Sequence, residues 1–221
     1  MQAPTRAFAI LAYEGIEPID IGATYGVLSM ARRLAPDLRF FVVSKAGGDL
    51  AMASGLRLIA DHSFADCPAA DILMVLGGPG WQEAARDTDI LKFVRAFHAR
   101  GGVVASVCTG GMIVAGSGLL DGRRATTKRE IVPGEQRPLD LLAQHHSDVQ
   151  AIEARVVDTG SVLTGGGVSF GIDMTLYLLQ RFVGGAVAAE TARILEYQSA
   201  WKANAAALPD VVEQRQDAVS T

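Results

Sequence analysis

Short, almost wholly apolar runs alternate along this chain with longer segments of helical periodicity, and this alternation restricts the fold more than any other feature. An apolar run without internal polar residues is typical of a central strand that is covered on both faces. Such runs occur at residues 6–13, 71–76 and 103–107, and a further strand is predicted at 38–44. Helices are predicted between and after them, at 19–33, 87–100, 109–118, 170–182 and 186–200. This order predicts a single-domain α/β fold whose mostly parallel sheet is sandwiched by helices.

The remaining segments complete that outline. Residues 49–53 and 56–60 flank a Ser-Gly pair and predict a small hairpin. We also expect a short extended piece at 124–127, a helix at 139–146, and strands at 151–157 and 161–164. After Pro209 the sequence becomes polar. The folded domain is therefore predicted to span residues 1–208, followed by a frayed segment at 209–221.

Composition excludes several classes of function. The formal net charge of the 221 residues is -4, which does not suit a nucleic-acid binder. No uncharged apolar stretch approaches the roughly 18 residues that span a bilayer, so no membrane partner is expected. The 2 cysteines cannot form a disulfide framework, which favours the reducing cytoplasm. No cluster of residues with metal-ligand spacing is present in the sequence, and neither a metal nor an organic cofactor is expected.

Three strands are followed at once by glycine-rich segments. These segments are residues 77–80, 108–111 and 164–167. In parallel α/β sheets, ligands bind at the carboxyl ends of the strands. The sequence therefore predicts that a binding site is formed where these three segments meet.

The second of these segments begins with Cys108, at the end of the run VVASVCTGG. One interpretation is a structural thiol, since free cysteine is among the most buried residue types. The other is a nucleophile on a sharp strand-to-helix turn, for which Thr109, Gly110 and Gly111 supply little bulk. A helix N-terminus lowers the pKa of a thiol, so this position favours a thiolate. The residues alone leave both interpretations open.

Two further groups are expected near this cysteine. Backbone N–H groups of Gly78 and Thr109 are candidates for an oxyanion-hole-like site, although the segment 77–80 is also consistent with a plain turn. Asp20 follows the first strand and is either a carboxylate that complements a helix dipole or an acid/base. Glu14 and Glu17 come from the same loop and compete with Asp20 for the second role.

Four long segments resemble the ThiJ/PfpI superfamily, which has a flavodoxin-like, glutamine-amidotransferase-like fold with a nucleophile elbow. They are SFADCPAADILMVLGGPG, ASVCTGG, GLLDGRRATT and LTGGGVSFGID. Within the superfamily the resemblance is strongest to the isocyanide hydratases. It implies that Cys108 is the nucleophile, that Asp20 is the acid/base, and that Thr109 and Gly78 supply N–H donors. It also implies a homodimer that acts on a small molecule without a cofactor.

Two departures from the family pattern lie close to these residues. Lys128-Arg129 follows GRRATT, where relatives usually carry His-Trp, so a Cys–His dyad at this position is absent. Ala23-Thr24 stands where relatives typically have Gly-Pro, and Gly26 stands where an acidic residue usually follows. The second change is next to Asp20 and is expected to reshape the pocket.

Three functions are consistent with this pattern. The first is the hydration of an isocyanide to an N-substituted formamide through a thioimidate on Cys108. The second is a ligand or redox sensor with an oxidisable Cys108. The third is a glyoxalase-like or deglycase-like activity on small aldehydes. Cys67, the other cysteine, is expected to be a packed or loop thiol.

Overall fold

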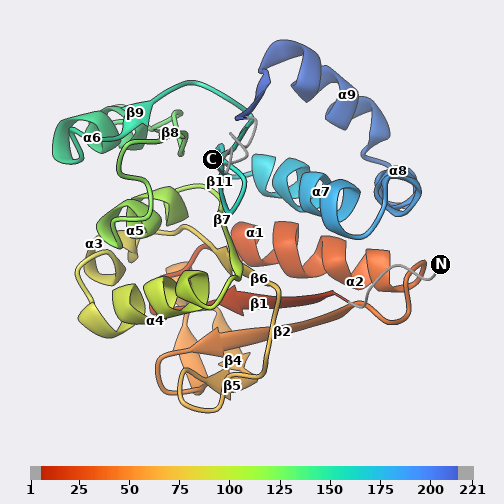
Figure 1. The fold of residues 1–221 in the computed structure, drawn as a ribbon, viewed down its shortest axis with the longest axis horizontal. Helices are drawn as coiled ribbons and strands as arrows, with labels where there is room; N and C mark the ends of the chain where they lie inside the picture. Colours follow the sequence, from red (N-terminus) through yellow and green to blue (C-terminus); the bar gives the residue numbers. More distant parts are fainter. Residues whose placement is uncertain (1–5, 214–221) are drawn as a thin grey trace, which may run out of the picture.

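A central sheet runs through the molecule in the computed structural model, which describes residues 6–213 (Figure 1). Over this range its strands follow the order β12-β10-β11-β7-β6-β1-β2-β5. Neighbouring strands pair in parallel except β10 and β11, which are antiparallel. The strands are β1 (Ala7–Leu11), β2 (Arg39–Ser44), β5 (His62–Ser63), β6 (Ile72–Val75), β7 (Val103–Ser106), β10 (Val156–Asp158), β11 (Val162–Gly165) and β12 (Asp210–Val212).

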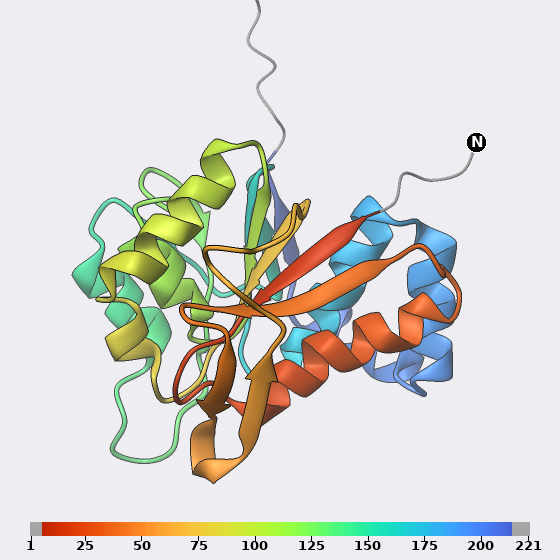
Figure 2. The same ribbon diagram turned by 90° about the horizontal axis from the view of Figure 1, so that it is seen from below.

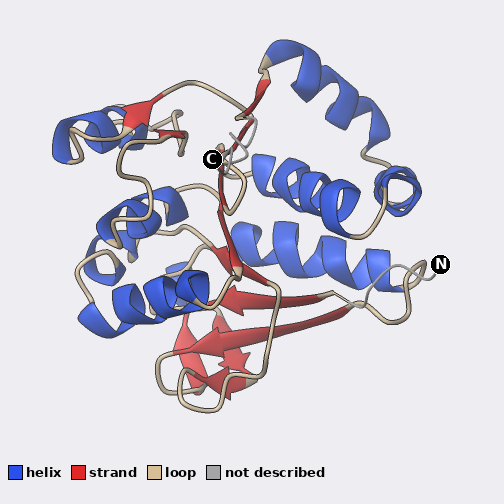
Figure 3. Ribbon diagram, viewed as in Figure 1, coloured by secondary structure: helices blue, strands red, loops and turns tan. Residues whose placement is uncertain are grey.

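Helices cover both faces of the sheet, as Figures 2 and 3 show. One layer contains α1 (Pro18–Ile21), the π-helix η1 (Gly22–Gly26), α2 (Val27–Arg32), α7 (Phe170–Phe182), α8 (Gly185–Ile194) and α9 (Gln198–Ala207). The other contains α3 (Trp81–Ala84), α4 (Thr88–Ala99), α5 (Gly110–Gly116) and α6 (Pro138–His145). The prediction of a mostly parallel α/β sandwich is therefore confirmed.

Two small sheets lie outside the main one. The predicted hairpin is present as β3 (Gly48–Ala51) and β4 (Arg57–Ala60), joined through the 3-10 turn η2 (Ala53–Gly55). The strands β8 (Arg124–Ala125) and β9 (Gln150–Ala151) pair in parallel and bracket the excursion that carries α6.

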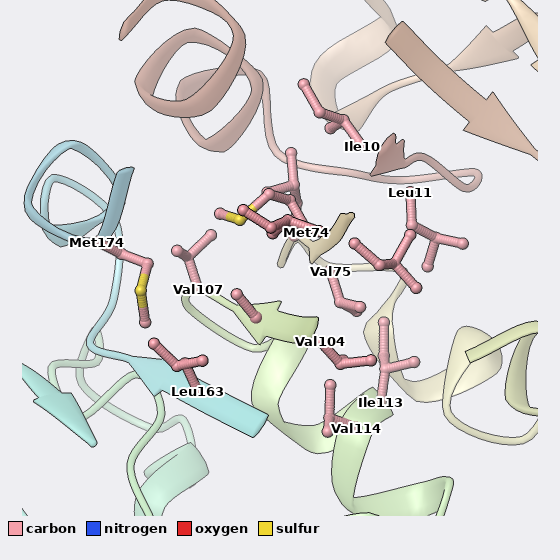
Figure 4. Close-up of a cluster of buried hydrophobic side chains, with 14 of the residues drawn as sticks. Ile10, Leu11, Met74, Val75, Val104, Val107, Ile113, Val114, Leu163 and Met174 are labelled. Atoms are coloured by element: carbon pink, nitrogen blue, oxygen red, sulfur yellow. The ribbon is translucent and has the colours of Figure 1, made fainter. Parts of the chain in front are cut away.

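The hydrophobic core fills both interfaces between the sheet and its helical layers (Figure 4). Strands β1, β6 and β11 are buried along their whole length. Met74 and Val107 lie toward Met174 of α7, whereas Val104 lies toward Ile113 of α5 (Figure 4). Because successive side chains of a strand point to opposite faces, a strand between two helical layers must be apolar at every position. This requirement explains the unbroken apolar runs of the sequence.

The structure differs from the predicted outline in four places. The strand predicted at 151–157 is divided into β9 and β10, which belong to different sheets. The helix predicted at 19–33 passes through the π-helix η1. The helix predicted at 186–200 ends at Ile194, and α9 begins after Glu196, which has a positive φ of 55°. The predicted frayed segment starting at 209 contributes strand β12, which pairs with β10. Backbone hydrogen bonds to the sheet edge order these residues despite their polar composition. Residues 214–221 lie outside the described residues.

Candidate active site

Cys108 lies at a strained turn between β7 and α5. Its φ of 53° is in the left-handed region, which costs a non-glycine residue on the order of 1–3 kcal/mol. Backbone contacts hold the turn: the Cys108 N–H donates to Gly166 O at 3.0 Å, and Thr127 Oγ1 donates to Cys108 O at 2.6 Å. The strain is therefore supported by neighbouring segments, as in a nucleophile elbow.

Two backbone N–H groups hydrogen-bond to the Cys108 sulfur and lower its pKa. They belong to Val168 and Thr109. Val168 has a φ of 54°, which is rare for a β-branched residue. Thr109 was predicted as a donor from the sequence, whereas Val168 was not. The three glycines at 165–167 were the available signal, because they mark a segment that approaches other backbone closely.

The loop after β6 has a different role from the predicted one. The Gly78 N–H donates to Thr109 Oγ1 at 2.9 Å, so it is not free to act as an oxyanion donor. The Gly77 N–H donates to Asp20 Oδ2 at 2.8 Å. A Cβ on Gly77 would lie 2.7 Å from Cys108 Cβ, so this close approach requires glycine. The loop therefore positions Asp20 and Thr109, and the prediction for Gly78 is corrected accordingly.

Asp20 is fully buried beside the thiol. Its Oδ1 has no hydrogen-bond partner among the described residues that satisfies normal geometry. Burial raises the pKa of Asp20 from 3.8 to about 6, while the Gly77 N–H and the Cys108 thiol lower it. A carboxyl with this pKa is able to take up and release a proton near neutral pH.

The competing carboxylates have other positions. Glu14 Oε2 accepts from the Ala51 N–H at 2.9 Å, which turns Glu14 toward the hairpin. Glu17 lines the cavity in front of the thiol, and its charge raises the pKa of Asp20. Of the three acidic residues in this loop, Asp20 is thus the one whose carboxyl contacts Cys108.

The thiol itself is not activated in the resting state. Burial, followed by the charge of Asp20, raises the pKa of Cys108 from 9.0 to about 12. This contradicts the expectation that the N-terminus of the following helix would favour a thiolate. Desolvation of a charged sulfur and the charge of Asp20 outweigh the two N–H donors. Any reaction that uses the Cys108 sulfur as a nucleophile would therefore need a base to remove the thiol proton.

A cavity of about 610 Å³ opens in front of the sulfur. One part of its wall is apolar, and the remainder carries charged and amide side chains. The lining residues are Glu17, Ile19, Gly78, Pro79, Trp81, Gln82, Cys108, Thr109, Lys128, Glu135, Gln136, Pro138, Leu141 and Val168. No histidine is among them in the part of the chain that the structure describes. Its size and mixed lining suit a small organic molecule.

Residues 6–213 contain neither a group of side chains arranged to hold a metal ion nor a helix that could cross a membrane. No group of at least 3 His, Cys, Asp or Glu side chains is arranged to hold a metal ion there. None of the helices in that range has both the length and the apolar character needed to cross a membrane.

Several known proteins are similar to this chain in sequence. Isonitrile hydratase of Pseudomonas putida is 33% identical over 191 residues, which cover 85% of this chain and 75% of that protein. The transcriptional regulator CdhR of Pseudomonas aeruginosa is 24% identical over 79% of this chain, which spans 50% of the regulator.

The fold of this chain is also similar to that of solved structures. A ThiJ/PfpI family protein from Pseudomonas syringae superposes with a TM-score of 0.74 at 27% identity, covering 88% of this chain and 76% of that one. The sequence model of the DJ-1/PfpI family matches residues 6–181, which include the elbow, Asp20 and the segment with Val168. The chain therefore belongs to the DJ-1/PfpI family.

Proposed function

We propose that this protein is a cysteine-dependent hydro-lyase that hydrates a small electrophilic carbon, with an isocyanide as substrate and an N-substituted formamide as product. The observation that carries the proposal is the buried pair of Asp20 and Cys108, which opens into a cavity. The 33% identity of this chain to isonitrile hydratase supports the choice of substrate. We further propose that it acts in the cytoplasm as a homodimer.

The first half of the reaction forms a thioimidate. Asp20 accepts the thiol proton through its free Oδ1 as the sulfur attacks the terminal isocyanide carbon. The new C–S bond leaves electron density on that carbon, which takes the proton from Asp20. The Thr109 and Val168 N–H groups stabilise the negative charge that develops on sulfur during the transfer.

The second half releases the product. Asp20 takes a proton from a water molecule, whose oxygen attacks the thioimidate carbon, and passes this proton to the nitrogen. As the tetrahedral intermediate collapses to the formamide, its hydroxyl proton moves to Asp20, the C–S bond breaks, and the departing thiolate takes that proton from Asp20. One isocyanide and one water give one formamide, so atoms and charges balance. A carboxyl whose pKa is about 6 is suited to both directions of transfer.

Redox sensing by Cys108 receives less support from the site. Oxidation of cysteine proceeds through the thiolate, and reactive sensor thiols have lowered pKa values and are accessible to solvent. Cys108 is buried and its pKa is raised to about 12. A buried neutral thiol with an adjacent base is better suited to catalysis than to sensing.

The test is turnover of cyclohexyl isocyanide, with the formamide measured by mass spectrometry. The wild type and Cys67→Ala should form the formamide, and Cys108→Ala should form none while keeping its melting temperature within a few degrees. Methylglyoxal is tested in parallel. Turnover of methylglyoxal alone would replace the hydratase by the aldehyde activity, and formamide production by Cys108→Ala would remove the proposed nucleophile.

A further inference from the structure

Lys128 occupies the position after GRRATT at which relatives usually carry histidine, and its side chain enters the cavity that contains Cys108. The backbone fixes it there, since Lys128 O accepts from the Leu139 N–H at 3.1 Å. Its stem lies on Gly167: a Cβ on that glycine would be 2.7 Å from Lys128 Cγ. The residue after Gly167 is Val168, the donor to the sulfur. Lys128 is thus packed on the loop that completes the active site.

The ammonium of Lys128 is only weakly neutralised. Its single ion-pair partner within residues 6–213 is Glu135, with Nζ and Oε2 4.0 Å apart. The Glu135 side chain is 54% exposed, and an ion pair of such length and exposure contributes little. The charge of Lys128 therefore remains available to the other groups of the cavity.

The titratable groups around the thiol are otherwise acidic or neutral. Asp20 raises the pKa of Cys108, Glu17 raises that of Asp20, and Tyr13 is buried near both. Lys128 acts in the opposite direction and lowers the pKa of both Cys108 and Asp20. It is the cation that these groups share.

We propose that Lys128 is an electrostatic positioning residue that stabilises the thiolate of Cys108 as its proton passes to Asp20. It supplies the positive charge that a histidine supplies in Cys–His enzymes, but it does not itself carry the proton. This inference rests on the proposed use of Cys108 as nucleophile, and it does not depend on which electrophile is the substrate.

The experiment measures alkylation of Cys108 by neutral iodoacetamide in the Cys67→Ala background, between pH 7 and 9.5. We expect Lys128→Met, which keeps the stem, to lower the second-order rate constant by about three- to tenfold. Lys128→Arg should restore it. Lys202→Met, a change of an exposed lysine on α9, is the matched control and should leave the rate unchanged.

Comparison of iodoacetate with iodoacetamide gives a second readout. A cation near the sulfur favours the anionic reagent, so the rate ratio of iodoacetate to iodoacetamide should fall in Lys128→Met. An unchanged ratio and pH profile in a folded Lys128→Met protein would overturn the role of Lys128. If Lys128→Met shows the expected alkylation changes but the wild type does not turn over isocyanide, only the proposed function would be overturned, because alkylation requires no catalysis.

Discussion

The two cysteines lie at opposite ends of the sheet, and their surroundings differ. Cys67 lies in the loop before β6, beside Arg100 at the amino ends of the strands, whereas Cys108 follows β7 at the carboxyl ends. Burial is the largest cause that raises the pKa of both thiols. Cys108 differs because it has a carboxyl to receive its proton, two N–H donors and Lys128.

This difference indicates where the reactivity of the site originates. Cys67 has a cation nearby, since Arg100 lowers its pKa, yet its thiol donates only to Pro68 O at 3.4 Å. A nearby positive charge is therefore common to both cysteines and does not distinguish them. The distinguishing component is Asp20, the proposed base, whose Oδ1 has no hydrogen-bond partner among the described residues.

Asp20→Asn removes the base and should separate catalysis from acidity. We expect isocyanide turnover to fall by about 10²- to 10³-fold, because proton transfer by a positioned group contributes on this scale. The charge of Asp20 raises the pKa of Cys108, so its loss should make iodoacetamide alkylation of Cys108 faster, not slower. Slower alkylation together with lost turnover would show that Asp20 acts only by keeping the thiol in place.

Gly77→Ala should disrupt the contact between the two loops of the site. The new Cβ would lie 2.6 Å from Thr109 N and 2.7 Å from Cys108 Cβ, both closer than van der Waals contact. We expect a loss of about 2–4 kcal/mol in unfolding free energy and a severe loss of turnover. The control is Gly185→Ala in α8, where nothing lies within 4 Å. It should be neutral or stabilising by about 0.4–1 kcal/mol in urea unfolding.

The raised pKa of Asp20 predicts a stability difference that depends on pH. The folded state binds the proton more tightly than the unfolded state between pH 3.8 and about 6, so the contribution of Asp20 to stability falls as pH rises through this range. The change in the contribution of Asp20 to the free energy of unfolding across this pH range is up to about 3 kcal/mol. Asn retains an acceptor for the Gly77 N–H and does not ionise. Asp20→Asn should therefore become more stable relative to the wild type from pH 4 to 7 in denaturant titrations, and a constant difference would contradict the shift.

Cys67→Ala should have the smallest effect. The thiol is only partly buried, and its weak hydrogen bond is to the next residue along the chain. We expect an unfolding free energy within about 1 kcal/mol of the wild type and unchanged turnover. Reduced turnover in this variant would connect the two ends of the sheet and weaken the contrast between the cysteines.

The local sequence was sufficient for those parts of the site that lie next to a recognisable strand. Cys108 and Thr109 follow an apolar run directly, and Asp20 follows the first one, so their placement at the carboxyl edge could be predicted. The segment containing Lys128 was noted as a departure from relatives, but no periodicity indicated that its side chain enters the cavity. Val168 was missed because its role depends on a positive φ, which a valine in the sequence does not suggest.

Hydrogen bonds between distant segments also determine which backbone N–H groups of residues 77–80 already have acceptors. The sequence indicated correctly that residues 77–80 approach the nucleophile. It could not show that the Gly78 N–H is already engaged by Thr109 Oγ1, or that the Gly77 N–H is engaged by Asp20. Partners of this kind are 31 and 57 positions apart in the chain, and only the folded sheet brings them together.

The α/β architecture follows from the sequence alone, because strands buried on both faces must be apolar throughout and leave an unmistakable pattern. The sequence also placed a cysteine at a strand end with little bulk after it. Only the tertiary structure decided the chemical state of that cysteine. Desolvation and the nearby carboxyl outweigh the N–H donors at Cys108, so the pKa of the thiol rises to about 12, and burial raises that of Asp20 to about 6. Ionisation depends on the dielectric and on charges and N–H donors gathered from separate segments, and this arrangement exists only after folding.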